Sequence, residues 1–156
     1  MKRRAVTLMN LLMLVMSSAG QTIDLGYDIK LTGEVVPFDS TAHTVTHCKV
    51  LDWQHDPICL IDGQPYFGSD LDYRMPRNHF RSLMIEISGK RTALDVTGMF
   101  NVSWDLSIHD GQFEIKPCEG GHILTGGFSD GAGVYTVTWK IVAGGAIRTE
   151  LKRAEH

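Results

Sequence analysis

The strongest constraint in this sequence is a two-residue alternation of apolar and polar side chains at both ends of the chain. Near the C-terminus, Tyr135, Val137, Trp139 and Ile141 alternate with Thr136, Thr138 and Lys140. Such alternation is typical of strands with one buried face. The segment 143–146 separates this run from Ile147–Leu151, so the C-terminus predicts a β-hairpin.

A similar alternation follows residue 20. The apolar positions are Ile23, Leu25, Tyr27, Ile29 and Leu31, with Asp24, Asp28 and Lys30 between them. This pattern predicts one strand of about nine residues with one face in water.

Glycine-containing turns divide the middle of the chain into short strands. Asp62-Gly63, Ser88-Gly89-Lys90 and Asp110-Gly111 supply the positive φ that tight hairpins require. The expected strand pairs are Ile58–Ile61 with Gln64–Phe67, Leu83–Ile87 with Thr92–Val96, and Leu106–Ile108 with Gln112–Lys116. We therefore expect an all-β fold, a single-domain antiparallel barrel or sandwich of about eight to ten short strands.

Helix signals are weak after residue 20. The best candidate is one turn over Pro76–Ser82, since proline is tolerated at a first helical position. The segment Phe67–Met75 has no clear period and predicts a surface loop.

The first twenty residues have the layout of a secretory signal peptide. Lys2, Arg3 and Arg4 precede an apolar run that is too short to span a bilayer unaided, and small residues follow it. We expect cleavage after Ala19 or Gly20, with an uncleaved membrane anchor as the alternative. Residues 21–156 then form the mature domain, in the periplasm or secreted, with no membrane insertion after cleavage.

The net charge of that domain limits the classes of partner that we expect. The whole chain has 15 Lys and Arg against 18 Asp and Glu, and loss of the three N-terminal cations leaves 12 against 18, a net charge of −6. Nucleic acids and anionic membrane surfaces attract basic patches, so neither is expected as a partner. A cationic protein partner is compatible with this charge.

Three cysteines lie in the exported part, where disulfides are permitted. We favour Cys48 with Cys59, because a turn between them brings two antiparallel strands together. Pairing of Cys118 with either one is the alternative, since sequence does not settle connectivity.

Residues Gly127–Gly131 match the G-x-S-x-G pattern of a serine hydrolase. A nucleophile elbow needs a strand before the serine and a helix after it. His122–Thr125 meets the first condition, but Val134 onward predicts a strand. We therefore interpret the segment as a glycine-rich connection, and we assign no catalytic residue.

The histidines and cysteines between residues 43 and 59 lack metal-site spacing. They are His43, His47, Cys48, His55 and Cys59. Structural zinc sites use spacings such as C-x₂₋₄-C, and a disulfide competes for both thiols. We therefore expect exposed histidines, and neither a metal nor another cofactor.

Candidate partner contacts come from three segments. The loop Phe128–Gly133 offers Phe128, Ser129 and Asp130, and the segment between the favoured cysteines offers Trp53 and Asp56. The loop Phe67–Arg77 offers Asp70, Tyr73, Arg74 and Arg77. The last three belong to a basic cluster that also holds His79 and Arg81. Guanidinium groups suit carboxylate or phosphate recognition, and a solvated loop is the alternative interpretation.

We recognise no enzyme family in five segments of the sequence. These segments are Ile61–Gly68, Gly98–Phe100, Phe128–Gly133, Trp139–Val142 and Arg148-Thr149. In overall plan, signal peptide and acidic charge, the chain resembles small exported bacterial β proteins that act as immunity or inhibitor proteins. That resemblance implies binding to another protein, such as a basic toxin or a cell-envelope-degrading hydrolase. The alternatives are a β-barrel that binds a small ligand in its interior, a carboxylate-based hydrolase, and a structural or adhesive envelope protein.

Overall fold

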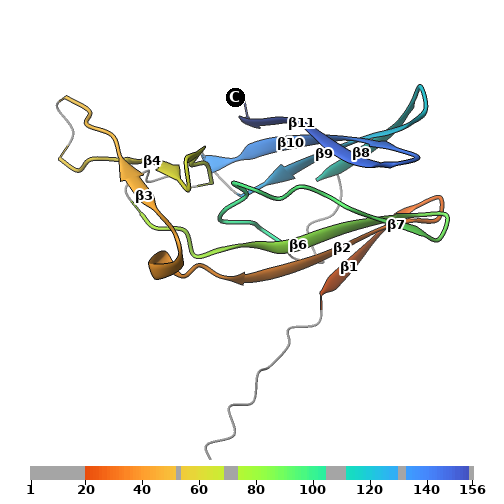
Figure 1. Ribbon diagram of the computed structural model, residues 1–156, viewed down its shortest axis with the longest axis horizontal. Coiled ribbons are helices and arrows are strands. Elements are labelled where there is room, and N and C mark those ends of the chain that lie inside the picture. Colours follow the sequence, from red (N-terminus) through yellow and green to blue (C-terminus); the bar gives the residue numbers. More distant parts are fainter. Residues whose placement is uncertain (1–19, 52–53, 69–73, 105–111, 130–132, 155–156) are drawn as a thin grey trace, which may run out of the picture.

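The computed structural model describes residues 20–51, 54–68, 74–104, 112–129 and 133–154. Two four-stranded antiparallel sheets lie face to face, and a small third sheet projects from one end (Figure 1). The described strands form separate sheets and close no barrel, so the sandwich form of the expected all-β fold is confirmed and the barrel form is wrong. No helix in the described part of the chain is long and apolar enough to cross a membrane.

The N-terminal sheet has the order β1-β2-β6-β7. Its strands are β1 (Gln21–Gly26), β2 (Ile29–Pro37), β6 (Asn78–Ile87) and β7 (Lys90–Ala93). The turn between β6 and β7 is Ser88-Gly89, whose φ values of 48° and 78° explain the glycine. The expected hairpin at this position is confirmed.

The nine-residue strand expected over residues 23–31 is wrong, because Tyr27 and Asp28 form a two-residue turn there with φ of 52° and 59°. The register shifts by one residue between Asp24 and Gly26, and Ile23 therefore pairs with Leu31. Because of that β-bulge, the side chains on the buried face have odd numbers both in β1, before the turn, and in β2, after it. The apolar alternation consequently continues across a hairpin as though the strand were unbroken.

The C-terminal sheet has the order β11-β10-β9-β8. Its strands are β8 (Phe113–Cys118), β9 (Gly121–Phe128), β10 (Tyr135–Val142) and β11 (Gly145–Arg153). The expected C-terminal hairpin is confirmed as β10 and β11. β8 pairs with β9 across Glu119-Gly120, a hairpin that the sequence analysis missed, while the expected partner strand 106–108 lies outside the described residues.

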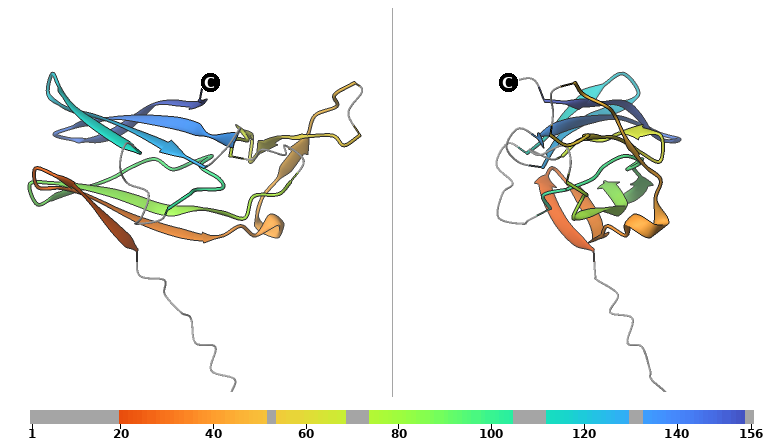
Figure 2. Two further views of the ribbon diagram at one scale, coloured as in Figure 1. Left: turned by 180° about the vertical axis from the view of Figure 1, so that it is seen from behind. Right: turned by 90° about the vertical axis from the view of Figure 1, so that its left-hand side faces the viewer.

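The third sheet, β3-β4-β5, comes from an insertion between β2 and β6. It contains β3 (Val45–His47), β4 (Ile58–Ile61) and β5 (Gln64–Pro65), preceded by a short 3₁₀ turn at Ser40–Ala42. The expected Asp62-Gly63 hairpin is confirmed between β4 and β5. We call residues 38–77 the arm; its three strands extend beyond the end of the two-layer sandwich (Figures 1 and 2).

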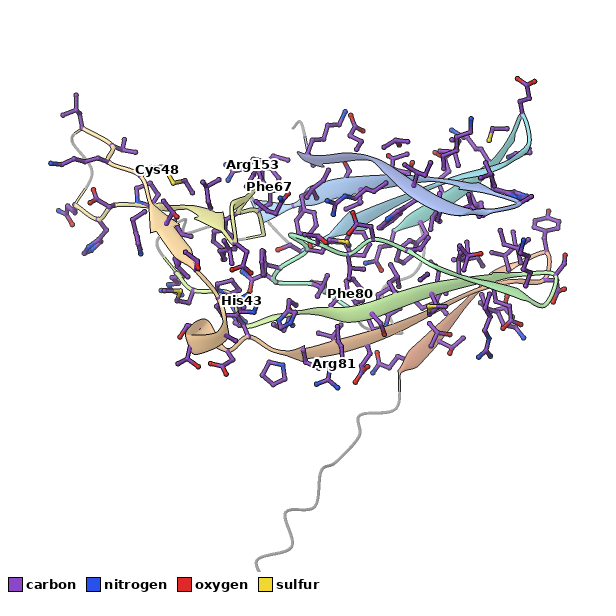
Figure 3. The ribbon with its side chains drawn as sticks, in the orientation of Figure 1. His43, Cys48, Phe67, Phe80, Arg81 and Arg153 are labelled. Atoms are coloured by element: carbon purple, nitrogen blue, oxygen red, sulfur yellow. A yellow bond between two sulfur atoms is a disulfide. The ribbon has the colours of Figure 1, made fainter. Side chains whose placement is uncertain are left out.

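The helical turn expected at Pro76–Ser82 is wrong, because β6 begins at Asn78. Phe80 is 3% exposed and packs between the sheets, whereas Arg81 points outward to Glu34 (Figure 3). The gain from burying Phe80 and Leu83 against both sheets outweighs a single isolated helical turn.

The core fills the space between the two large sheets. Its fully buried side chains come from both sheets and include Leu31, Leu83, Ile85, Leu124, Phe128, Tyr135, Val137 and Trp139. Trp139 Nε1 donates a hydrogen bond to the Asp95 carbonyl oxygen at 2.9 Å, so its polar atom is satisfied inside the core.

Candidate functional site

The outer part of the arm is a finger closed by a disulfide. Cys48 and Cys59 are joined, as the sequence analysis favoured, with their Cα atoms 5.7 Å apart. The Cys48 amide also donates to the Pro57 carbonyl oxygen at 2.9 Å, which continues the β3–β4 pairing toward the tip. We call residues 48–59 the finger; Figure 3 shows Cys48 well beyond the sandwich.

The finger exposes both apolar and polar groups. Leu51 is 88% exposed, and Gln54, His55 and Asp56 of the same finger are also exposed. His47 and these three polar residues line an open hollow of about 480 Å³. His47 Nδ1 donates to the Asp56 carbonyl oxygen at 3.1 Å, which fixes one wall of that hollow. Trp53, the other expected contact of this segment, lies outside the described residues.

A small separate core anchors the arm. Ile58, Ile61, Tyr66 and Phe100 are buried together, with Phe38 and Val45 packed against them. Phe100 comes from the segment after β7 and pairs with His79 of β6 through a β-bridge. The arm is therefore attached to the sandwich through its own apolar cluster.

Two of the expected contact loops lie against each other at this end of the sandwich. The Ser129 hydroxyl donates to the Gly68 carbonyl oxygen at 3.0 Å. Asn101 Nδ2 donates to the same oxygen at 2.6 Å and to the Tyr66 hydroxyl at 2.9 Å. The loop after β5 and the loop after β9 are thus held together, although they are 61 residues apart in the chain.

Two of the three arginines in the basic cluster, Arg74 and Arg77, are held through their backbones. The Tyr66 hydroxyl donates to the Arg74 carbonyl oxygen at 3.1 Å, and the Arg77 amide donates to Asn101 Oδ1 at 2.7 Å. Both residues are exposed. Arg81 instead forms an ion pair with Glu34, with 2.7 Å between Nη1 and Oε1. Asp70, Tyr73 and Asp130 lie outside the described residues.

Phe128, which the sequence analysis proposed as a partner contact, is buried in the core. Its ring is 0% exposed and packs in the core against Phe80, Phe113, Tyr135 and Trp139. Ser129, the next residue in this loop, is partly buried.

A cluster of imidazoles and aromatic rings lies where the arm meets the sandwich. His43 stacks on Phe38 with 4.6 Å between ring centroids and 13° between ring planes. His43 Nδ1 donates to Asp62 Oδ2 at 2.6 Å. His79 stands edge-on to His43, with centroids 5.4 Å apart. The cluster joins the connection after β2, the β4–β5 turn and β6.

Two groups of this cluster, Asp62 and His79, have shifted pKa values. Hydrogen bonds from His43 and from the Thr44 amide hold the pKa of Asp62 below its usual value. Burial, with the neighbouring charges of His43 and Arg81, lowers the pKa of His79. His79 Nδ1 is buried and has no hydrogen-bond partner in the described structure. An open hollow of about 440 Å³, lined in part by Glu34, Asp39, His43, His79 and Arg81, borders the cluster.

The serine motif has no hydrolase geometry. The chain enters it from β9 and leaves it into β10, as the sequence predicted, so a strand follows where an elbow requires a helix. The Ser129 hydroxyl is bonded to a backbone carbonyl. Within the described ranges, no three histidine, cysteine or carboxylate side chains converge as metal ligands.

Sequence reasoning missed several residues of this region. Leu51, Asn101 and the contact of His79 with His43 became visible only when the arm was placed beside β6. The one available signal was the richness of residues 43–59 in histidine and cysteine. Comparisons with known proteins found no matching family model, no similar curated protein and no similar solved structure.

Proposed function

We propose that this chain is an exported protein-binding module that acts as an immunity or inhibitor protein against a basic toxin or a cell-envelope-degrading enzyme. The finger is the part that enters the partner. The observation that carries the proposal is the disulfide-closed finger projecting from the sandwich with Leu51 88% exposed.

A closed finger suits insertion because little conformational freedom is lost when it binds. The disulfide and the hydrogen bond between Cys48 and Pro57 restrict its backbone before any partner arrives. An exposed leucine beside hydrogen-bonding groups also resembles the apolar anchor and polar rim of protein interfaces. Arg74 and Arg77 are exposed in the last part of the arm, where Tyr66 and Asn101 hold their backbones.

The compartment and the charge agree with this proposal. A disulfide is consistent with an oxidising location outside the cytoplasm. A net charge of −6 without residues 1–20, from 12 cations against 18 acids, favours encounter with a cationic partner. That attraction acts mainly on the association rate and weakens as salt rises.

The test is a panel of purified basic envelope-degrading enzymes, including muramidases and cell-wall amidases, assayed for inhibition and for complex formation by calorimetry. We expect sub-micromolar binding to at least one enzyme, and a loss of at least about tenfold in affinity for Leu51→Asp, since a buried apolar anchor is replaced by a charge. Ile147→Asp is the matched control, because Ile147 is 66% exposed on β11 next to the β10–β11 turn, at the far end from the arm (Figure 1). A panel with no binder, or equal effects of both substitutions, would count against the proposal.

A further inference from the structure

The junction between the arm and the sandwich contains two titratable rings in contact. We propose that His43 and His79 form a pH-sensitive joint that holds the arm against the sandwich at neutral pH and releases it when both rings are protonated. The joint itself does not depend on any partner; only its consequence for binding rests on the proposed function.

The two rings belong to different parts of the molecule. His79 is on β6 of the sandwich, whereas His43 follows the 3₁₀ turn of the arm and is tied to the β4–β5 turn through Asp62. Phe38 packs face-to-face on His43 and edge-to-face with His79, at centroid distances of 4.6 and 6.1 Å. A change in the charge of these rings therefore acts directly on the contact between arm and sandwich.

The charged groups around the pair are distributed unequally. Asp39 and Asp62 face His43, from the connection after β2 and from the β4–β5 turn. Glu34 of β2 and Arg81 of β6 lie beside His79, and these two side chains are paired with each other. The Asp62 carboxylate lies 2.6 Å from His43 Nδ1, whereas a proton on His79 meets the positive charges of Arg81 and His43.

The second proton is the one that loosens the joint. It places two imidazolium rings with centroids 5.4 Å apart in a partly buried setting, where like charges repel more strongly than in water. His79 Nδ1 is buried without a partner, so the charged ring gains no hydrogen bond at that atom in exchange. Separation of the arm from β6 exposes both rings to water and relieves the repulsion.

The direction in which stability changes with pH follows from proton linkage. The folded state disfavours the charged form of His79, so the unfolded or released state binds its proton at a higher pH. The stabilising contribution is present above the ordinary histidine value of 6.5 and is lost progressively as pH falls below it. The response therefore lies in the mildly acidic range that histidine switches use.

The experiment compares amide hydrogen exchange in the oxidised full chain at about pH 7.5 and about pH 5, after correction for intrinsic rates, with histidine titration followed by NMR. We expect exchange in 45–66 to become about tenfold faster at the lower pH, while exchange in 135–153 stays unchanged. His79→Gln should remove the response, and His122→Gln, on β9 of the C-terminal sheet, should keep it.

Three results would overturn the joint. They are unchanged arm protection although NMR shows both rings protonated, a full response in His79→Gln, and equal loss of protection in the arm and in 135–153. If His79→Gln lacks sandwich protection at neutral pH, His43→Gln replaces it, since the glutamine amide would still donate to Asp62 but carry no charge. None of these measurements requires a binding partner, so they stand apart from the enzyme panel.

Discussion

The Ser129 hydroxyl donates a hydrogen bond to the Gly68 carbonyl oxygen at 3.0 Å. This contact connects the loop after β9 to the loop after β5, next to the base of the arm. Asn101 donates to the same carbonyl oxygen, so Gly68 is the meeting point of three segments. The serine that matches a hydrolase motif therefore serves to join loops.

Gly68 is expected to resist substitution. A Cβ at this position would lie 2.7 Å from the Phe100 carbonyl oxygen, and φ is +91°. Gly68→Ala should lower the free energy of unfolding by about 1–3 kcal/mol more than Gly63→Ala, because the clashing atom is backbone. Gly63 is the matched control, since its φ is +75° and a Cβ added there would meet no atom within 4 Å. Urea denaturation measures both, and equal losses would contradict the close approach at Gly68.

Ser129→Ala should weaken the fold slightly and leave no catalytic signature. The variant loses one hydrogen bond, so we expect a fall of about 1 kcal/mol in the free energy of unfolding. Ser40→Ala, at an exposed position of the 3₁₀ turn, should change it less. Hydrolysis of activated esters by the wild type and by Ser129→Ala should be indistinguishable; an esterase activity lost with the hydroxyl would restore the nucleophile interpretation.

The sequence predicted several hairpins whose turns carry glycine, but it missed the one at Glu119-Gly120 and it failed where pairing depends on distant residues. Asp62-Gly63 and Ser88-Gly89 adopt the positive φ values that their composition suggested. The β1–β2 turn stayed hidden because its bulge preserves the alternation, and Tyr27-Asp28 contains no glycine. Local signals also favoured a helical turn at Pro76, whereas pairing with β2 makes the segment a strand.

In the candidate site, too, contacts within one hairpin were predicted and contacts between distant residues were not. The pairing of Cys48 with Cys59 was favoured because of the turn expected between them, and it is confirmed, although the sequence alone left Cys118 as an alternative partner. The His43–His79 contact and the bond from Ser129 to Gly68 join residues 36 and 61 positions apart, and no local pattern encodes them. Phe128 was expected as a contact residue in the loop Phe128–Gly133, but it is the last residue of β9 and it is buried in the core.

The disulfide is expected to stabilise the finger more than the rest of the molecule. It closes a short loop with a sequence separation of 11, so Cys48→Ser with Cys59→Ser should cost on the order of 2–3 kcal/mol. Cys118→Ser should cost little, because Cys118 is a free thiol beside the β8–β9 turn. Thermal unfolding of the three proteins under non-reducing conditions checks this order, and a larger loss from Cys118→Ser would contradict it.

Asp62→Asn should reduce stability at neutral pH, and the reduction should vanish in acid. The folded-state pKa of Asp62 lies below its usual 3.8, owing first to His43 and then to the Thr44 amide. The stabilisation from its ionised form is present above that value and is lost as pH falls through the folded pKa. Because the side chain is 45% exposed, the difference from wild type should stay within about 1 kcal/mol.

Urea titrations of wild type and Asp62→Asn at a series of pH values measure this difference. Asp28→Asn, in the exposed β1–β2 turn, is the control for the loss of one negative charge. A gap that widens toward acid would mean that the Asp62 carboxylate is destabilising in the folded state.

The two ends of the arm meet where the insertion begins. Pro37 pairs with Asn78 in the sheet, and the Phe38 amide donates to the Arg77 carbonyl oxygen at 3.0 Å. A chain that leaves and re-enters a scaffold at neighbouring points leaves a gap that a tight β-turn spans. The forty-residue arm is thus an insertion between two adjacent anchor points, and any replacement for it must also fill the space that Tyr66 and Phe67 occupy against Phe100 and Tyr135.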